Sequence, residues 1–181
     1  MFKMWISMKN ILAYRPPWEK KEVFGWLRDK LWKRTQSFNG NFLSKAGKEI
    51  LIKSVLQVIP SYVMSCFKLP DYLIRDLESF ITNFWWNEDG KNKMHWVNWQ
   101  TLTSSKRDGG LGFRNLHAFN LALLGKQIWR IIEFPDSLLS KVYKAKYFSN
   151  SSILHAVPKA DSSYTWKSIC AALELVNEGT H

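Results

Sequence analysis

Two basic segments, the first at residues 30–34 and the second at residues 45–53, contain the side chains with the clearest capacity for binding chemistry. Lysine and arginine bind nucleic-acid phosphates by charge and by hydrogen bonds, and they release the counterions that surround the phosphates. The formal net charge of +11 at pH 7 is typical of proteins whose partner is a polyanion. The candidate phosphate-binding residues are Lys30, Lys33, Arg34, Lys45, Lys48 and Lys53. The alternative, to which we give similar weight, is that these side chains only form a solvated surface.

No pattern in the chain predicts a catalytic or metal site. Cys66 and Cys170 lie far apart within apolar helical patterns, which is typical of reduced cysteines and not of a disulfide framework. The four histidines have no metal-ligand spacing to these cysteines. The glycine-rich run at 106–110 lacks the Gly-Lys-Ser/Thr ending of a phosphate-binding loop, so we interpret it as a turn that brings Leu111 and Phe113 into the core. We therefore expect no catalytic residue, metal, cofactor or small-molecule substrate.

Apolar residues that recur every three or four positions predict the helices that carry the basic residues. One helix is expected over residues 20–36, with Phe24, Leu27 and Leu31 on its buried face. A second helix should begin after Ser44, whose hydroxyl suits an N-cap, and should end near Pro60, which cannot donate a backbone hydrogen bond. Its expected inward residues are Ile50, Leu51, Val55, Val58 and Ile59, with Lys45, Lys48 and Lys53 on the opposite side.

The same spacing predicts helices through the rest of the chain. They are expected after Pro70, over 115–132, from Asp136 as N-cap, and from Ser162 or Ser163 to the end. Residues 87–97 should form a loop or a short hairpin. Four tryptophans flank that loop, namely Trp85, Trp86, Trp96 and Trp99; we interpret them as a small core in preference to a base-stacking platform. The predicted fold class is all-α. No apolar run reaches the length of about 18 residues that a membrane helix needs, so no membrane contact is expected.

Several blocks of sequence agree in order and spacing with one known family. The blocks are GGLGFRNLHAFNLALLGKQIWR at 109–130, LSKAGKEILIKSV at 43–55, IPSYVMSCFKLP at 59–70, FWW at 84–86, HWVNW at 95–99, and shorter matches at 147–148 and 165–169. Together they resemble the segment between the polymerase and ribonuclease H regions of plant LINE-type (non-LTR) retrotransposon reverse transcriptases.

The resemblance implies a thumb-like unit of three helices followed by a helical connector. It implies an out-of-family segment at 1–19, the thumb-like unit at 20–86, the loop or hairpin at 87–97, and the connector at 98–181. A thumb grips an RNA or DNA duplex through backbone phosphates without reading bases. The resemblance assigns that task to the face with Lys45, Lys48 and Lys53.

Reverse transcriptases hold two metal ions with an Asp-Asp pair, and no Asp-Asp occurs in this chain. Acidic residues that could form a ribonuclease H site are also sparse. We therefore expect a non-catalytic fragment of a retrotransposon RNA-directed DNA polymerase that binds nucleic acid independently of sequence. The alternative is a non-functional relic or a helical protein-interaction module. In either case a thumb without its palm should expose apolar surface at Phe24, Leu27 and Trp26 or Trp32. The expected location is intracellular, with nucleus or cytoplasm favoured over mitochondrion.

Overall fold

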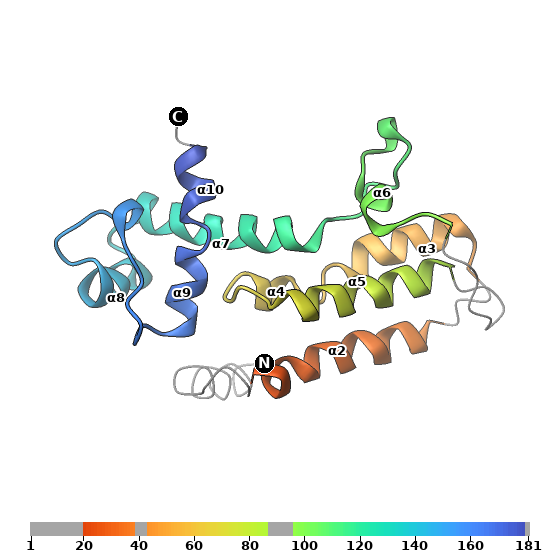
Figure 1. Cartoon of the computed structure of the whole chain (residues 1–181), viewed down its shortest axis with the longest axis horizontal. Helices are drawn as coiled ribbons and strands as arrows, with labels where there is room; N and C mark the ends of the chain where they lie inside the picture. The colour runs from red at the N-terminus through yellow and green to blue at the C-terminus, as the bar shows by residue number, and fades with distance from the viewer. Residues whose placement is uncertain (1–19, 39–42, 87–95, 180–181) are drawn as a thin grey trace. The chain divides into compact units, whose positions relative to one another are not determined.

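The computed structural model describes residues 20–38, 43–86 and 96–179, and these residues contain helices and no strand. The elements are α2 (Lys20–Ser37), α3 (Lys45–Leu51), the π-helix η3 (Ile52–Leu56), α4 (Ser61–Met64), α5 (Asp71–Trp86), α6 (Trp99–Thr103), the 3₁₀ turn η4 (Lys106–Asp108), α7 (Leu116–Glu133), α8 (Leu138–Tyr147), the 3₁₀ turn η5 (Ile153–His155), α9 (Tyr164–Cys170) and α10 (Leu173–Glu178) (Figure 1). The all-α prediction is confirmed. None of the helices in this described part is long and apolar enough to cross a membrane.

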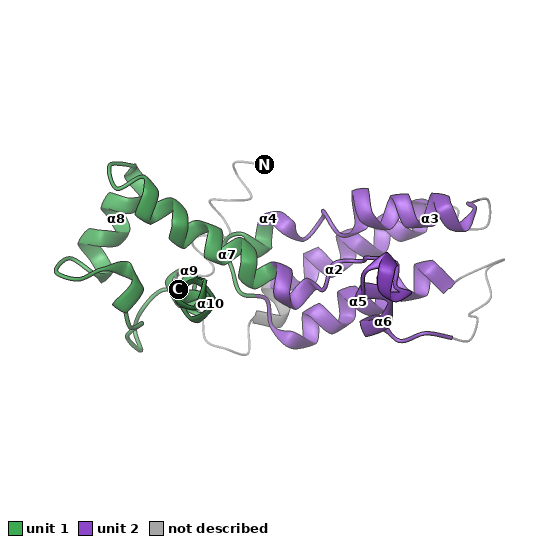
Figure 2. Cartoon of the chain, turned by 90° about the horizontal axis from the view of Figure 1, so that it is seen from above, with its two compact units in different colours: residues 1–23, 63–68, 120–181 green, residues 24–62, 69–119 purple. Residues whose placement is uncertain are grey.

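The chain divides into two compact units that do not follow chain order (Figure 2). Unit 1 comprises residues 1–23, 63–68 and 120–181, and unit 2 comprises residues 24–62 and 69–119. This grouping places α6 and η4 with the first helices, whereas the sequence suggested a boundary at the loop before them. The domain boundaries drawn from the resemblance remain a prediction.

Unit 2 has a core built from α2, η3 and α5. Its fully buried side chains include Phe24, Leu27, Leu31, Ile52, Leu56, Leu73, Leu77 and Ile81. Ser44 caps α3 as predicted, because its Oγ accepts a hydrogen bond from the backbone N–H of Gly47 at 3.2 Å. The burial of Phe24 and Leu27 shows that the expectation of exposed apolar surface at those positions is wrong. The apolar face of α2 is thus buried within this chain, although Trp32 on the same helix is 50% exposed.

The second predicted helix is interrupted earlier than Pro60. After α3 the backbone widens into η3, in which the N–H of Gln57 bonds the carbonyl of Ile52 at 3.0 Å. Turns then lead to α4. The predicted break is therefore present, but a π turn precedes it, and apolar spacing alone does not reveal such a turn.

The glycine-rich run forms the turn that we predicted. Gly109 adopts a left-handed φ of 79° after η4, and the N–H groups of Leu111 and Phe113 both donate to the carbonyl of Leu102 at 3.2 Å. Phe113 is buried and Leu111 is half-buried. The ring of Phe113 packs against Trp85 at 5.7 Å and Trp99 at 6.0 Å. The core interpretation thus holds for these two tryptophans, whereas Trp96 is 76% exposed; residues 87–95 lie outside the described part.

Unit 1 packs the last helices around Trp166. Its buried residues include Leu124, Ile128, Ile131, Phe148, Trp166, Ile169, Ala172, Leu173 and Val176. Asn120, which is 1% exposed, donates from Nδ2 to the carbonyls of Met64 at 2.8 Å and Phe67 at 3.0 Å. Ser163 caps α9, as one of the two predicted starts. A turn at Ala171 then divides the predicted single last helix into α9 and α10.

The cap of α8 differs from the prediction. Ser137 accepts the backbone N–H of Ser140 at 3.2 Å, so it is the N-cap in place of Asp136. Asp136 instead forms an exposed ion pair with Lys141 at 3.5 Å. Both residue types suit an N-cap, and the position is decided by where helical geometry begins, which sequence does not fix to within one residue.

Candidate nucleic-acid interface

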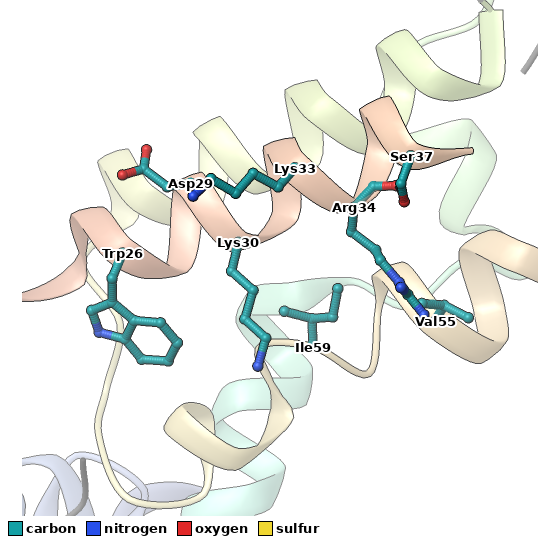
Figure 3. Close-up of a pocket in the computed structure, with 8 residues that line it drawn as sticks. All are labelled: Trp26, Asp29, Lys30, Lys33, Arg34, Ser37, Val55 and Ile59. Carbon is teal, nitrogen blue, oxygen red and sulfur yellow. The ribbon is translucent and has the colours of Figure 1, made fainter. Parts of the chain in front are cut away.

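The α2 helix presents a row of one aromatic and two cationic side chains. Trp26, Lys30 and Arg34 follow at intervals of four residues, which places them one above another on one helix face. Figure 3 shows them extending from α2 toward the segment that carries Val55 and Ile59. The row therefore forms one wall of a groove whose opposite side is apolar.

This groove, the α2 groove, has a volume of about 740 Å³. It is lined by Trp26, Asp29, Lys30, Lys33, Arg34, Ser37, Val55 and Ile59. Lys30, Lys33 and Arg34 are exposed, and among the described residues that line the groove Asp29 is the only carboxylate. Asp29 points away from the apolar side in Figure 3, and its carboxylate lies 4.0 Å from Nε of Arg28, outside the lining. The groove thus combines a cationic wall with an apolar surface.

Two of its side chains make ring contacts that help to hold them in place. The guanidinium of Arg34 lies 5.1 Å from the ring centroid of Phe38, within the usual cation–π range. Nζ of Lys30 lies 6.0 Å from the ring centroid of Trp26, at the outer limit of that range. The Lys30 contact is therefore the weaker one, and Lys30 can leave the ring at small cost.

The lysines of the second basic segment are engaged differently. Nζ of Lys45 donates to the carbonyl of Trp85 at 3.3 Å and lies over its ring at 5.3 Å. Nζ of Lys53 binds Oε1 of Glu49 at 2.8 Å, and Nζ of Lys106 binds the same oxygen at 2.7 Å. The hydrogen bond from Lys106, followed by that from Lys53, lowers the pKa of Glu49. This carboxylate offsets part of the positive charge that a phosphate would meet there.

Lys48 does not lie on the outer face. Its side chain is 1% exposed, while Ile50, predicted to point inward, is 66% exposed. The buried positions Lys48, Ile52 and Leu56 recur at an interval of four, which keeps them on one helix face, whereas the prediction placed the inward face at Ile50 and Leu51. The long apolar stem of lysine can pack in such a position. The predicted location of Lys48 is thus wrong, and the face with Lys45, Lys48 and Lys53 is not continuous.

The structure therefore brings three of the six candidate residues together and separates the others. Lys30, Lys33 and Arg34 line one groove, and Trp26 joins them as a residue that charge alone did not single out. The four-residue interval between Trp26, Lys30 and Arg34 was the available signal. Within residues 20–38, 43–86 and 96–179, no group of three or more His, Cys, Asp or Glu is arranged to hold a metal ion.

Known proteins give two informative similarities. Over 123 residues the chain is 46% identical to an "Uncharacterized mitochondrial protein" of Arabidopsis thaliana, which covers 67% of this chain and 80% of that protein. Over 163 residues it is 32% identical to a "Putative ribonuclease H protein" of the same plant, which covers 88% of this chain and 26% of that protein. The chain thus spans about a quarter of the second relative. No protein-family model and no solved structure matches it.

Proposed function

The chain belongs to the family of the Arabidopsis mitochondrial protein and has a retrotransposon-related origin. From this premise we propose that it is a nucleic-acid-binding segment. In this proposal it corresponds to the thumb and connector of a LINE-type reverse transcriptase. It binds RNA or DNA through backbone phosphates, without reading sequence and without catalysing a reaction itself.

The α2 groove is the observation that supports binding. Its described lining contains three exposed cations and one carboxylate, so a phosphate backbone would gain charge-assisted hydrogen bonds from Lys30, Lys33 and Arg34. Lys45 and Lys53, which already bind protein groups, contribute secondary contacts. This revises the assignment implied by the family resemblance, because the main phosphate contacts move from the second basic segment to the first.

The non-catalytic part of the proposal rests on the sequence. The Asp-Asp pair with which reverse transcriptases hold metal ions does not occur in the chain. The name of the second relative refers to ribonuclease H, but that protein is far longer than the segment it shares with this chain. Incubation of the purified chain with labelled RNA–DNA hybrid and primer–template in Mg²⁺ and in Mn²⁺ should leave both unchanged; reproducible cleavage or extension would contradict the proposal.

Salt dependence tests the binding site. The affinity of a labelled duplex should fall steeply with salt, with a slope of about −0.9 per phosphate contact on a log–log plot for DNA. Changing Lys30, Lys33 and Arg34 together to Gln should flatten the slope by roughly two to three units. Each cation that is removed leaves one phosphate unneutralised, so one counterion fewer is released from the nucleic acid on binding. The matched control changes the three exposed lysines of α8 in unit 1 to Gln in the same way; these are Lys141, Lys144 and Lys146.

The two triple variants carry the same loss of charge, so they separate a site from general attraction. Circular dichroism should show unchanged helicity in both. Equal flattening by both triples would indicate diffuse charge attraction and would reject the α2 groove as the site. Absence of any salt-dependent binding would reject nucleic-acid binding altogether.

A helical protein-interaction module is the second candidate. Unit 1 exposes large apolar side chains near the end of α7 and on α8, with Phe134 and Val142 54% exposed and Leu138 80% exposed. Exposed apolar residues that cluster are typical of interaction surfaces. Gel filtration distinguishes the candidates. The interaction module would be favoured if the protein self-associates, if changing Leu138 and Val142 to Glu abolishes that self-association, and if the protein binds no nucleic acid.

A further inference from the structure

We propose that the α2 groove binds single-stranded nucleic acid in preference to duplex, with one unpaired base stacked on Trp26. This inference rests on the proposed nucleic-acid binding and specifies the form of nucleic acid that the same site takes. It follows from the order of side chains along α2, from the apolar side of the groove, and from its volume.

The order of side chains matches the two chemistries of a nucleotide strand. Trp26 offers an indole face, and Lys30 and Arg34 on the same helix face offer two cations in succession. A strand lying along α2 would therefore place a base at the ring and consecutive phosphates at the cations. Base–aromatic stacking combined with a cationic track is the usual way in which proteins bind single strands without sequence preference.

The apolar side of the groove distinguishes a single strand from a duplex. In a duplex the bases are covered by their neighbours, so a protein that binds only phosphates gains nothing from a half-buried indole such as that of Trp26 or from aliphatic side chains. Here Val55 and Ile59 face the cationic row and leave an apolar surface that an unpaired base can cover (Figure 3). The groove is open to solvent and has a volume of about 740 Å³, which leaves room for a base.

The contact between Lys30 and Trp26 is compatible with this occupant. At 6.0 Å from the ring centroid, Nζ of Lys30 is at the limit of cation–π attraction. A base that takes its place on the ring releases the ammonium to a phosphate.

Fluorescence anisotropy with three probes tests the inference on the full chain. The probes are an eight-nucleotide oligo-dT, the same strand with abasic sites throughout, and a duplex of equal length, all at low salt. Wild-type protein should bind oligo-dT at least about fivefold more tightly than the abasic strand, because one stacked base contributes about 1 kcal/mol or more. Oligo-dT should also bind more tightly than the duplex.

Three variants locate the stacking ring. Trp26→Leu should remove the advantage of oligo-dT over the abasic strand, whereas Trp26→Phe, which keeps an aromatic face, should retain most of it. Trp32→Leu is the matched control, since Trp32 is half exposed on the same helix but contacts Phe80, at 5.8 Å between ring centroids, and does not line the groove. The control should bind as wild type does.

The outcomes separate this inference from the proposed function. If wild-type protein binds oligo-dT and the abasic strand equally, or binds the duplex most tightly, the stacking site is rejected while phosphate binding stands. If Trp26→Leu and Trp32→Leu lose the same affinity, Trp26 is not the stacking ring. If none of the probes binds, the proposed function fails as well. The wild-type comparison of the first two strands remains decisive even if Trp26→Leu does not fold.

Discussion

Gly110 is predicted to be the least replaceable of the described glycines. A Cβ at this position would lie 2.2 Å from the carbonyl oxygen of Ser104 and 2.6 Å from that of Thr101. Both are backbone atoms, so no side-chain rotation can make room, and the turn itself must open. Gly110→Ala should therefore disturb the closure of the loop that holds Phe113 in the core.

The expected cost can be worked out from the hydrogen bonds at the clash. The Ser104 carbonyl accepts the N–H of Gly112 at 2.9 Å, and the Thr101 carbonyl accepts the N–H of Ser104 at 3.2 Å. Losing two backbone hydrogen bonds costs about 1–3 kcal/mol, and loosened packing around Phe113 adds to it. Gly110→Ala should thus lower the free energy of unfolding by about 2–4 kcal/mol.

Two other glycines of unit 2 serve as matched controls. Gly109 has a φ of 79°, but no atom lies within 4 Å of the place that a Cβ would take, so Gly109→Ala should cost only the left-handed penalty of about 1–2 kcal/mol. Gly25 lies within α2 and its Cβ position likewise has nothing within 4 Å, so Gly25→Ala should stabilise by up to about 1 kcal/mol. Urea unfolding followed by far-ultraviolet circular dichroism measures all three. A Gly110→Ala cost no larger than that of Gly109→Ala would refute the close approach.

Three further predictions concern polar groups. Glu49→Gln should lower the free energy of unfolding at pH 7, because the two lysine contacts of Glu49 stabilise only its ionised form. The difference in free energy from wild type should vanish as pH falls through the lowered folded pKa of Glu49. Urea unfolding of both proteins at pH 7 and pH 3 measures it, and an equal difference at the two pH values would contradict the prediction. Asn120→Ala should cost about 2–4 kcal/mol, because two buried carbonyls lose their donor; a thermal midpoint unchanged from wild type would count against it. Burial raises the pKa of Cys170 to about 11, so iodoacetamide should label it at pH 8 roughly two hundredfold more slowly than an exposed cysteine of pKa ~8.5, in proportion to the thiolate fraction. Mass spectrometry of folded and urea-unfolded protein measures the ratio, and comparable rates in the two would show that the thiol is not protected.

Local signals in the sequence predicted most of the helices. Ser44 and Ser163 mark real helix starts, and the apolar spacing over residues 20–36 identified Phe24, Leu27 and Leu31, which the structure buries. These features depend on neighbours within a turn or two, so they can be read from a single chain. The cap at Ser137 differs by one residue from the prediction, which is the precision such signals allow.

The candidate site was less predictable because it depends on helix phase and on tertiary grouping. The inward position of Lys48 shows that the predicted inward face of the second helix was out of phase. Apolar spacing predicted the burial of Phe24, whereas the resemblance to a thumb without its palm wrongly predicted that Phe24 would be exposed. Lys30, Lys33 and Arg34 were chosen for charge, but their grouping with Trp26, Val55 and Ile59 appears only when α2 lies beside η3 in unit 2. Charge identified the cations, whereas the structure identified which of them share a groove.

The widened turn at η3 also determines how the chain would respond to a change in its length. A π turn contains about one residue more than an α turn, so loss of a single residue between Ile52 and Leu56 would restore regular helix instead of breaking it. Because the widened turn holds its extra residue within one revolution, this loss would leave the segments before and after the turn in the same phase. A three-nucleotide deletion in the gene would therefore leave Ile59 facing the groove and every cation of α2 in place. Family members that differ by one residue here would keep both the charge and the shape.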